Sequence, residues 1–102
     1  MSTATPVLTP DTDTAVKERV APRWKVILHN DDVTTFAFVI ELLIRLFGKS
    51  QGDALQLTQE VHDTRSAIVA VTSFERAELY VEQVRSLARP RNFPLTATIE
   101  PE

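Results

Sequence analysis

Apolar residues along the chain follow two spacings, and each spacing predicts a type of element. Short runs rich in β-branched and aromatic residues are typical of strands, whereas apolar residues every three or four positions are typical of amphipathic helices. In chain order the predicted elements are a strand at 24–29, helices at 36–47 and 51–62, a strand at 66–72, a helix at 74–88 and a strand at 95–99. This β-α-α-β-α-β order predicts an α+β domain with helices on one face of a small, largely antiparallel sheet.

Capping residues mark where the predicted helices begin. Thr34 or Thr35 is the expected N-cap of the first helix, and Ser50 and Ser73 precede the second and third. Gly48 follows the first helix, as expected of a C-terminal cap. The apolar stripe of the first helix is expected to consist of Phe36, Val39, Ile40, Leu43 and Phe47. The corresponding stripe of the second helix is Ala54, Leu57, Thr58 and Val61.

The first 22 residues differ in composition from the rest of the chain. They hold three of the six prolines among Thr, Ser, Asp and Ala, without aromatic residues or a sustained apolar period. Such a segment buries too little apolar surface to offset its ordering entropy. We therefore expect a disordered N-terminal extension at 1–22, followed by one domain at 23–102.

Composition and charge argue against several functional classes. The net charge of −3 gives no basic surface for nucleic acid. No apolar run approaches the roughly 20 residues that a membrane span needs, and the N-terminus lacks the pattern of a secretory signal. The chain has no cysteine, which fits a reducing compartment. We expect a cytoplasmic protein that binds neither nucleic acid nor membrane.

Hydrogen-bond acceptors are crowded where the first predicted strand ends. Asn30, Asp31 and Asp32 follow that strand directly, and His62 ends the second helix. Such a rim suits a primary ammonium group, and it also suits a metal ion. Dedicated metal spacing is absent, and two glycines are too few for a phosphate-binding loop. Without a cysteine or a glycine-flanked serine, nucleophilic catalysis is poorly supported.

The longer pattern resembles the ClpS family. Members of this family are adaptors that bind substrates with a destabilising N-terminal residue (N-degrons) and deliver them to a Clp AAA+ unfoldase and its protease. The resemblance covers about 24–100 and rests on the run Lys-Val-Ile-Leu-His-Asn-Asp-Asp at 25–32, the Phe- and Val-containing helix, Val61-His62 and the final Pro-Leu-x-x-x-Ile. It implies a sandwich of three antiparallel strands and three helices, an adaptor rather than an enzyme, and an N-terminal extension that enters the unfoldase.

The resemblance also implies a role for each site residue. Asn30, Asp31 and His62 would hold the α-amino group of the substrate, with Asp32 and Thr34 at the rim. The implied apolar pocket for the first side chain is lined by Leu28, Phe36, Val39, Thr58, Val61 and Leu95. The implied ligands are proteins or peptides with N-terminal Phe, Tyr, Trp or Leu. The implied partner is a ClpA- or ClpC-type unfoldase, contacted through Glu75. No cofactor and no metal are implied.

Several residues depart from the family pattern. Phe36 stands at a gate position that is often Met, and Thr58 stands at a wall position that is usually Met or another apolar residue. We expect these changes to alter the pocket. Arg65 replaces a common Gly and carries a strain cost if this position requires a positive φ. Tyr80 stands where a basic residue is expected one turn after Glu75, which departs from the family pattern at the unfoldase contact.

Two other functional classes stay open at this point. One is a generic protein-interaction domain of similar topology, like the C-terminal domain of the ribosomal stalk protein, without a pocket for an N-terminal residue. The other is a small metal-dependent hydrolase that uses Asp31, Asp32 and His62. Only the adaptor interpretation demands a free amine on the ligand. Binding of a peptide with N-terminal Phe, compared with its acetylated form, would separate the three classes.

Overall fold

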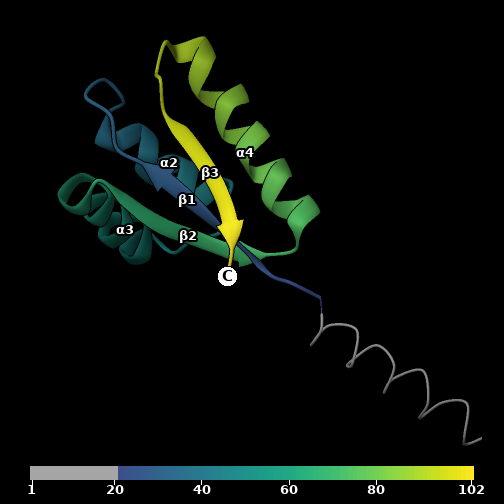
Figure 1. Ribbon diagram of the computed structural model, residues 1–102. Helices are drawn as coiled ribbons and strands as arrows, with labels where there is room; N and C mark the ends of the chain where they lie inside the picture. Colours follow the sequence, from purple (N-terminus) through teal and green to yellow (C-terminus); the bar gives the residue numbers. More distant parts are fainter. Residues whose placement is uncertain (1–20) are drawn as a thin grey trace, which may run out of the picture.

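The computed structural model describes residues 21–102, so nearly all of the extension predicted at 1–22 lies outside the described residues. The elements, in chain order, are β1 (Trp24–His29), α2 (Phe36–Arg45), α3 (Gln51–Thr64), β2 (Ser66–Thr72), α4 (Phe74–Ala88), the 3-10 helix η1 (Arg89–Arg91) and β3 (Thr96–Pro101) (Figure 1). This confirms the predicted order of strands and α-helices and adds one 3-10 turn after α4.

The three strands form one antiparallel sheet in the order β2-β1-β3, with β1 in the centre (Figure 1). His29, the last residue of β1, lies opposite Ser66 at the start of β2 and opposite Thr96 at the start of β3. The register of β1 with β2 shifts between Val26 and Ile27. The segment that leaves β1 is therefore close both to the end of α3 and to the loop that enters β3.

One face of the sheet carries the core. Its buried side chains are Val26, Leu28, Ala67, Val69 and Ala97. Helix α4 packs against all three strands, and α3 packs against β2. The opposite face is open to solvent: Ile68 is 47% exposed, and Lys25 forms an ion pair with Glu100 there at 3.6 Å. The expectation that helices cover one face of the sheet is therefore confirmed.

Helix α2 is shorter than predicted. Thr35 is its N-cap, with the hydroxyl oxygen accepting a hydrogen bond from the Phe38 amide at 3.2 Å. The helix ends at Arg45 instead of residue 47, because the chain turns through Gly48 at φ 69°. The left-handed region is one that glycine enters without steric cost, so the turn that follows α2 is encoded at this position.

The buried face of α2 is also rotated from the predicted stripe. Its buried residues are Phe38, Val39, Leu42 and Leu43. The ring of Phe38 packs edge to face against Phe93, with 5.0 Å between ring centroids. Phe36, predicted to lie in the core stripe, is instead 44% exposed. Helix α2 thus turns Phe38 toward the loop before β3 and leaves Phe36 at the surface.

Helix α3 is two residues longer than predicted, and β3 is shifted along the chain. Ser50 caps α3 by accepting from the Asp53 amide at 3.1 Å, as expected. The helix continues to Thr64, whose hydroxyl donates to the Glu60 carbonyl at 2.8 Å. Strand β3 begins one residue after the predicted start, so Leu95 lies in the preceding loop. Within residues 21–102, no helix is long and apolar enough to cross a membrane.

Candidate functional site

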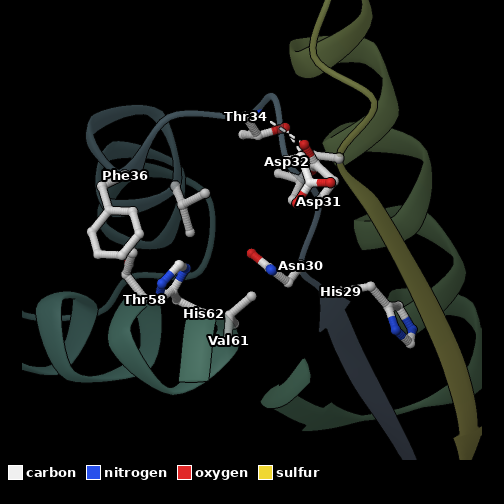
Figure 2. A pocket seen from close by; sticks show the side chains of 11 residues that line it. His29, Asn30, Asp31, Asp32, Thr34, Phe36, Thr58, Val61 and His62 are labelled. Atoms are coloured by element: carbon white, nitrogen blue, oxygen red, sulfur yellow. Dashed lines mark hydrogen bonds between the residues drawn. The ribbon is translucent and has the colours of Figure 1, made fainter. Parts of the chain in front are cut away.

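A cavity of about 230 Å³ opens between the end of β1, the start of α2 and the last turns of α3 (Figure 2). Its walls combine a polar rim with an apolar interior. The lining residues are His29, Asn30, Asp31, Asp32, Thr34, Phe36, Val39, Thr58, Val61, His62 and Leu95. The cavity thus brings together the predicted site residues with two exceptions, Leu28 and Glu75.

The backbone brings Asn30 and His62 to the same side of the cavity. The Asn30 amide N–H donates to the Arg65 carbonyl at 2.8 Å, which ties the chain after β1 to the residue that follows α3. Arg65 can present its carbonyl there because it turns the chain sharply, at φ 79°. His62 lies in the last turn of α3, and Figure 2 shows the Asn30 amide projecting toward it. Two side chains 32 positions apart in the sequence therefore face one opening.

Asp31 organises the turn between β1 and α2. Its Oδ1 accepts from the backbone amides of Val33 at 2.8 Å and Thr34 at 2.7 Å, and its Oδ2 accepts from the Thr34 hydroxyl at 2.7 Å. Thr34 is therefore bound to Asp31, whereas Thr35 caps α2. Of the two predicted N-caps, Thr34 or Thr35, the structure confirms Thr35, and the Thr34 hydroxyl donates to the carboxylate instead.

These interactions keep the Asp31 carboxyl ionised. Partial burial acts to raise its pKa, but the hydrogen bonds from Thr34 and Val33, together with the charge of Arg89, outweigh burial. The net result is a pKa below the ordinary value. The rim of the cavity therefore holds a fixed negative charge at neutral pH.

The side chains of Asn30 and His62 differ from that of Asp31 in their hydrogen bonding. Within the part of the chain that the structure describes, hydrogen bonds occupy both oxygens of Asp31 but include none to the side chains of Asn30 and His62. An amide offers a carbonyl acceptor and two N–H donors, and a neutral imidazole offers one acceptor and one donor. These groups are available to a ligand that enters the cavity.

The walls inside the cavity are mainly apolar side chains that are buried. Val39 and Val61 are buried, and Leu95 is only 1% exposed. Thr58 is the one polar member of this wall among the described residues, and its hydroxyl donates to the Ala54 carbonyl within α3 at 2.7 Å. Because that proton is used inside the helix, the Thr58 hydroxyl has no proton left to donate to a ligand.

Phe36 and His62 form an aromatic contact at the cavity mouth. Their ring centroids are 5.2 Å apart, and the planes meet at 70°, which is an edge-to-face arrangement. Both side chains are exposed (Figure 2). The apolar spacing of α2 indicated a core position for Phe36, so sequence reasoning did not foresee this contact. It depends on the packing of α2 against α3.

Two residues near the cavity point elsewhere. Leu28 is fully buried in the core beneath the helices and does not line the cavity, contrary to the expected wall. Strand alternation explains this, because Leu28 shares the buried face of the sheet with Val26. The His29 ring lies on the other side of β1 (Figure 2), where it hydrogen-bonds to the Thr98 hydroxyl at 2.7 Å.

The geometry does not assemble a metal site. Among residues 21–102, no three His, Asp or Glu side chains lie together in a way that could hold a metal ion. The set Asp31, Asp32 and His62, on which the hydrolase alternative depends, is therefore not a ligand group. The rim can accept hydrogen bonds and carries negative charge, which fits a cationic hydrogen-bond donor.

The residues considered for unfoldase contact lie outside the cavity. Glu75 is exposed in the first turn of α4. Tyr80 is half-buried and stacks on Phe47, with ring centroids 4.5 Å apart. Tyr80 thus packs α4 against the segment that follows α2.

Comparisons with known proteins agree on one family. The family model described as "ATP-dependent Clp protease adaptor protein ClpS" matches residues 19–98. The ClpS adapter protein of Desulforapulum autotrophicum is 42% identical over 86 residues, which cover 84% of this chain and 83% of that protein. The one from Acetivibrio thermocellus is 39% identical over 90 residues, covering 88% and 91%.

A solved structure shares the fold. Agrobacterium tumefaciens ClpS2, determined with L-phenylalaninamide bound, superposes with a TM-score of 0.77 and 33% sequence identity. The match covers 79% of this chain and 98% of that one.

Proposed function

The chain belongs to the ClpS family of Clp protease adaptors, which is not a family of enzymes, and from this premise we propose that its cavity binds the free N-terminal residue of N-degron substrates. One observation carries the proposal: Asn30 and His62, with side chains free for a ligand, meet at the mouth of an apolar cavity. The relationship to ClpS2 supports it, because L-phenylalaninamide combines a free amine with an aromatic side chain.

In this proposal the rim recognises the ammonium group. The side-chain carbonyl oxygen of Asn30 accepts a hydrogen bond from the ammonium group, and the side-chain N–H of Asn30 donates to the first peptide carbonyl. The His62 imidazole accepts a second hydrogen bond from the ammonium group, and it must be neutral to do so. Asp31 adds negative charge and reaches the ammonium through water, since its oxygens already accept bonds within the turn. Asp32 and Thr34 complete the rim.

The interior of the cavity takes the first side chain. Phe36, Val39, Thr58, Val61 and Leu95 form the proposed wall. A hydrogen bond to a charged group contributes about 1.5–3 kcal/mol, and burial of one Leu or Phe side chain contributes about 1.5–3 kcal/mol. Association costs several kcal/mol, so we expect a dissociation constant on the order of micromolar. Such an affinity lets an adaptor release its substrate.

The proposed partners follow from the family. We propose delivery to a ClpA- or ClpC-type unfoldase in the cytoplasm, with the exposed Glu75 as one contact. The proposed substrates begin with Phe, Tyr, Trp or Leu. A Glu75→Lys variant is expected to bind peptide like the wild type and to lose delivery, measured as degradation of an N-terminal Phe reporter by the reconstituted unfoldase and protease.

The decisive experiment compares two forms of one peptide. A peptide with a free N-terminal Phe should bind in the micromolar range by isothermal titration calorimetry, whereas the N-acetylated form should bind at least thirtyfold more weakly. A peptide that begins with Gly serves as control for the side chain. Equal binding of the free and acetylated peptides would contradict the proposal.

A further inference from the structure

The loop between η1 and β3 supplies one wall of the cavity without being part of any regular element. It includes Asn92, which is in the left-handed region at φ 63°, and Pro94. Leu95 ends this loop, is almost completely buried and lines the cavity. A loop has few backbone hydrogen bonds of its own, so the position of Leu95 requires support from elsewhere in the molecule.

Arg89 supplies that support. Its Nη1 donates to the Phe93 carbonyl at 2.9 Å and to the Leu95 carbonyl at 2.8 Å. One terminal nitrogen thus joins two carbonyls of the loop, and one of them belongs to the cavity wall itself. The backbone of the same turn adds bonds from Asn92 to Arg89 at 2.9 Å and from Phe93 to Ala88 at 3.1 Å. The side chain of Arg89 is the part of this network that reaches Leu95.

Arg89 also acts on the polar rim of the cavity. Its positive charge is one of the influences that lower the pKa of Asp31, which organises the turn at the rim. The guanidinium therefore serves the polar rim through its charge and the apolar wall through its hydrogen bonds. Arg85, one turn earlier, is exposed like Arg89 but binds Glu82 at 2.7 Å instead of the loop, and no feature of the residue spacing distinguishes the two arginines.

We propose that Arg89 is a positioning residue of the cavity, which holds the Leu95 wall in place and thereby sets the preference for a large first side chain. The proposal rests on the proposed function and extends it to a residue that does not line the cavity. An unsupported loop would let Leu95 withdraw from the ligand. A large first side chain would lose contact area, whereas a small one that does not reach Leu95 would lose little.

The test compares Arg89→Met with a matched control, Arg85→Met. Competition titrations measure affinity for free-amine peptides that begin with Phe and with Ala. Arg89→Met is expected to weaken Phe binding about tenfold and Ala binding less than twofold, so the ratio of the two affinities falls. Arg85→Met is expected to keep both affinities. Arg89→Lys, which keeps the charge but is one bond shorter, is expected to lose about threefold for Phe.

Each outcome has a distinct meaning. If Arg89→Met weakens binding of both peptides equally, the ratio of their affinities is unchanged, and this would show a general structural role and overturn the proposal. An unchanged ratio without any weakening would overturn it as well. Should Arg89→Met fail to fold by circular dichroism, the ratio measured for Arg89→Lys decides. Peptide-free NMR gives a separate reading: the Leu95 methyl signals should shift in Arg89→Met and not in Arg85→Met. If wild type does not discriminate free from acetylated Phe peptides, the proposed function fails, whereas the methyl spectra still decide the role of Arg89.

Discussion

The two polar parts of the cavity rim are built in opposite ways. Asp31 accepts three hydrogen bonds from its own turn, so its carboxylate shapes the chain between β1 and α2. Asn30 and His62 are held in place by the backbone, through the bond from the Asn30 amide to the Arg65 carbonyl. Their side chains remain available. The difference shows that one polar residue at a site can stabilise the fold while its neighbour is available to bind the ligand.

The largest expected effect tests the ligand side of this comparison. Asn30→Ala and His62→Ala should each weaken binding of an N-terminal Phe peptide by around 2 kcal/mol, roughly thirtyfold, because a bound charge loses a partner. The melting temperature should change little, since neither side chain forms a hydrogen bond within the described fold. Calorimetry and melting curves measure both. Gln59→Ala is the matched control, because Gln59 is exposed on α3 and does not line the cavity. Wild-type affinity in both alanine variants would refute this assignment.

Asp31→Asn tests the other side and should affect stability first. We expect a loss of about 1 kcal/mol at pH 7, because an amide accepts the turn hydrogen bonds less strongly than a carboxylate. The folded-state pKa of Asp31 is lowered, so its contribution is complete above the pKa of the unfolded chain and disappears as pH falls through the folded-state pKa.

Urea unfolding of wild type and Asp31→Asn at a series of pH values measures this dependence. The difference between the two proteins should shrink as the pH falls below the ordinary Asp value of 3.8. Asp32→Asn, at an exposed position next in the chain, is the control and should show no such difference. A constant difference between Asp31→Asn and wild type at every pH would argue that the charge is not what stabilises the turn.

The apolar wall extends the comparison to side-chain preference. Thr58 is shorter than Met, so the cavity floor should favour N-terminal Phe, Tyr and Trp over Leu by about 1 kcal/mol, roughly fivefold. β-Branched Val and Ile should be excluded by the bulk of Phe36. Thr58→Met should fill the floor and reduce the advantage of the aromatic residues, whereas Leu55→Met, exposed on the same helix, should not. Fluorescence competition with peptides that differ in the first residue measures the ranking. Tighter binding of Leu than of all three aromatics would refute this model.

The smallest effect concerns the backbone that supports Asn30. Arg65 is at φ 79°, a conformation that costs a residue with a Cβ more than glycine. Arg65→Gly should therefore raise the free energy of unfolding by about 0.5–1 kcal/mol and leave peptide affinity unchanged, because only the Arg65 carbonyl serves Asn30. Arg65→Ala retains the Cβ and should show no gain. Stabilisation by both variants would point to the arginine side chain rather than to the backbone.

Local signals account for the parts of the fold that could be predicted. The strands β1 and β2 and the helix α4 have uninterrupted patterns and, for α4, a serine cap, and their predicted bounds agree with the structure. Apolar spacing places the end of α2 two residues too late, because it continues past the point where the chain turns, and it places the end of α3 two residues too early, because that helix continues through polar residues. Gly48 and Arg65 determine those ends through backbone conformation.

The candidate site also has parts that could be predicted from the sequence and parts that could not. Asn30 and His62 could be named because the resemblance supplied their pairing, which residue spacing alone did not. The exposure of Phe36 could not be predicted, because it depends on contacts between distant segments. The burial of Leu28 follows from strand alternation, and the support from Arg89 is a local contact that apolar spacing does not report. Phe36, for example, contacts His62 of α3, while Phe38 of the same helix contacts Phe93 in the loop before β3. Such contacts follow from how α2 is seated, and sequence periodicity does not report that.

The position of β2 at the edge of the sheet has a consequence for solubility. This strand, Ser-Ala-Ile-Val-Ala-Val-Thr, carries no charge and no proline, and β1 is its sole partner in the described sheet. Segments of this composition with an unpaired edge are prone to self-association. That edge is open in the folded domain, so it can pair with another copy of the chain without any unfolding, and self-association through β2 should rise with protein concentration.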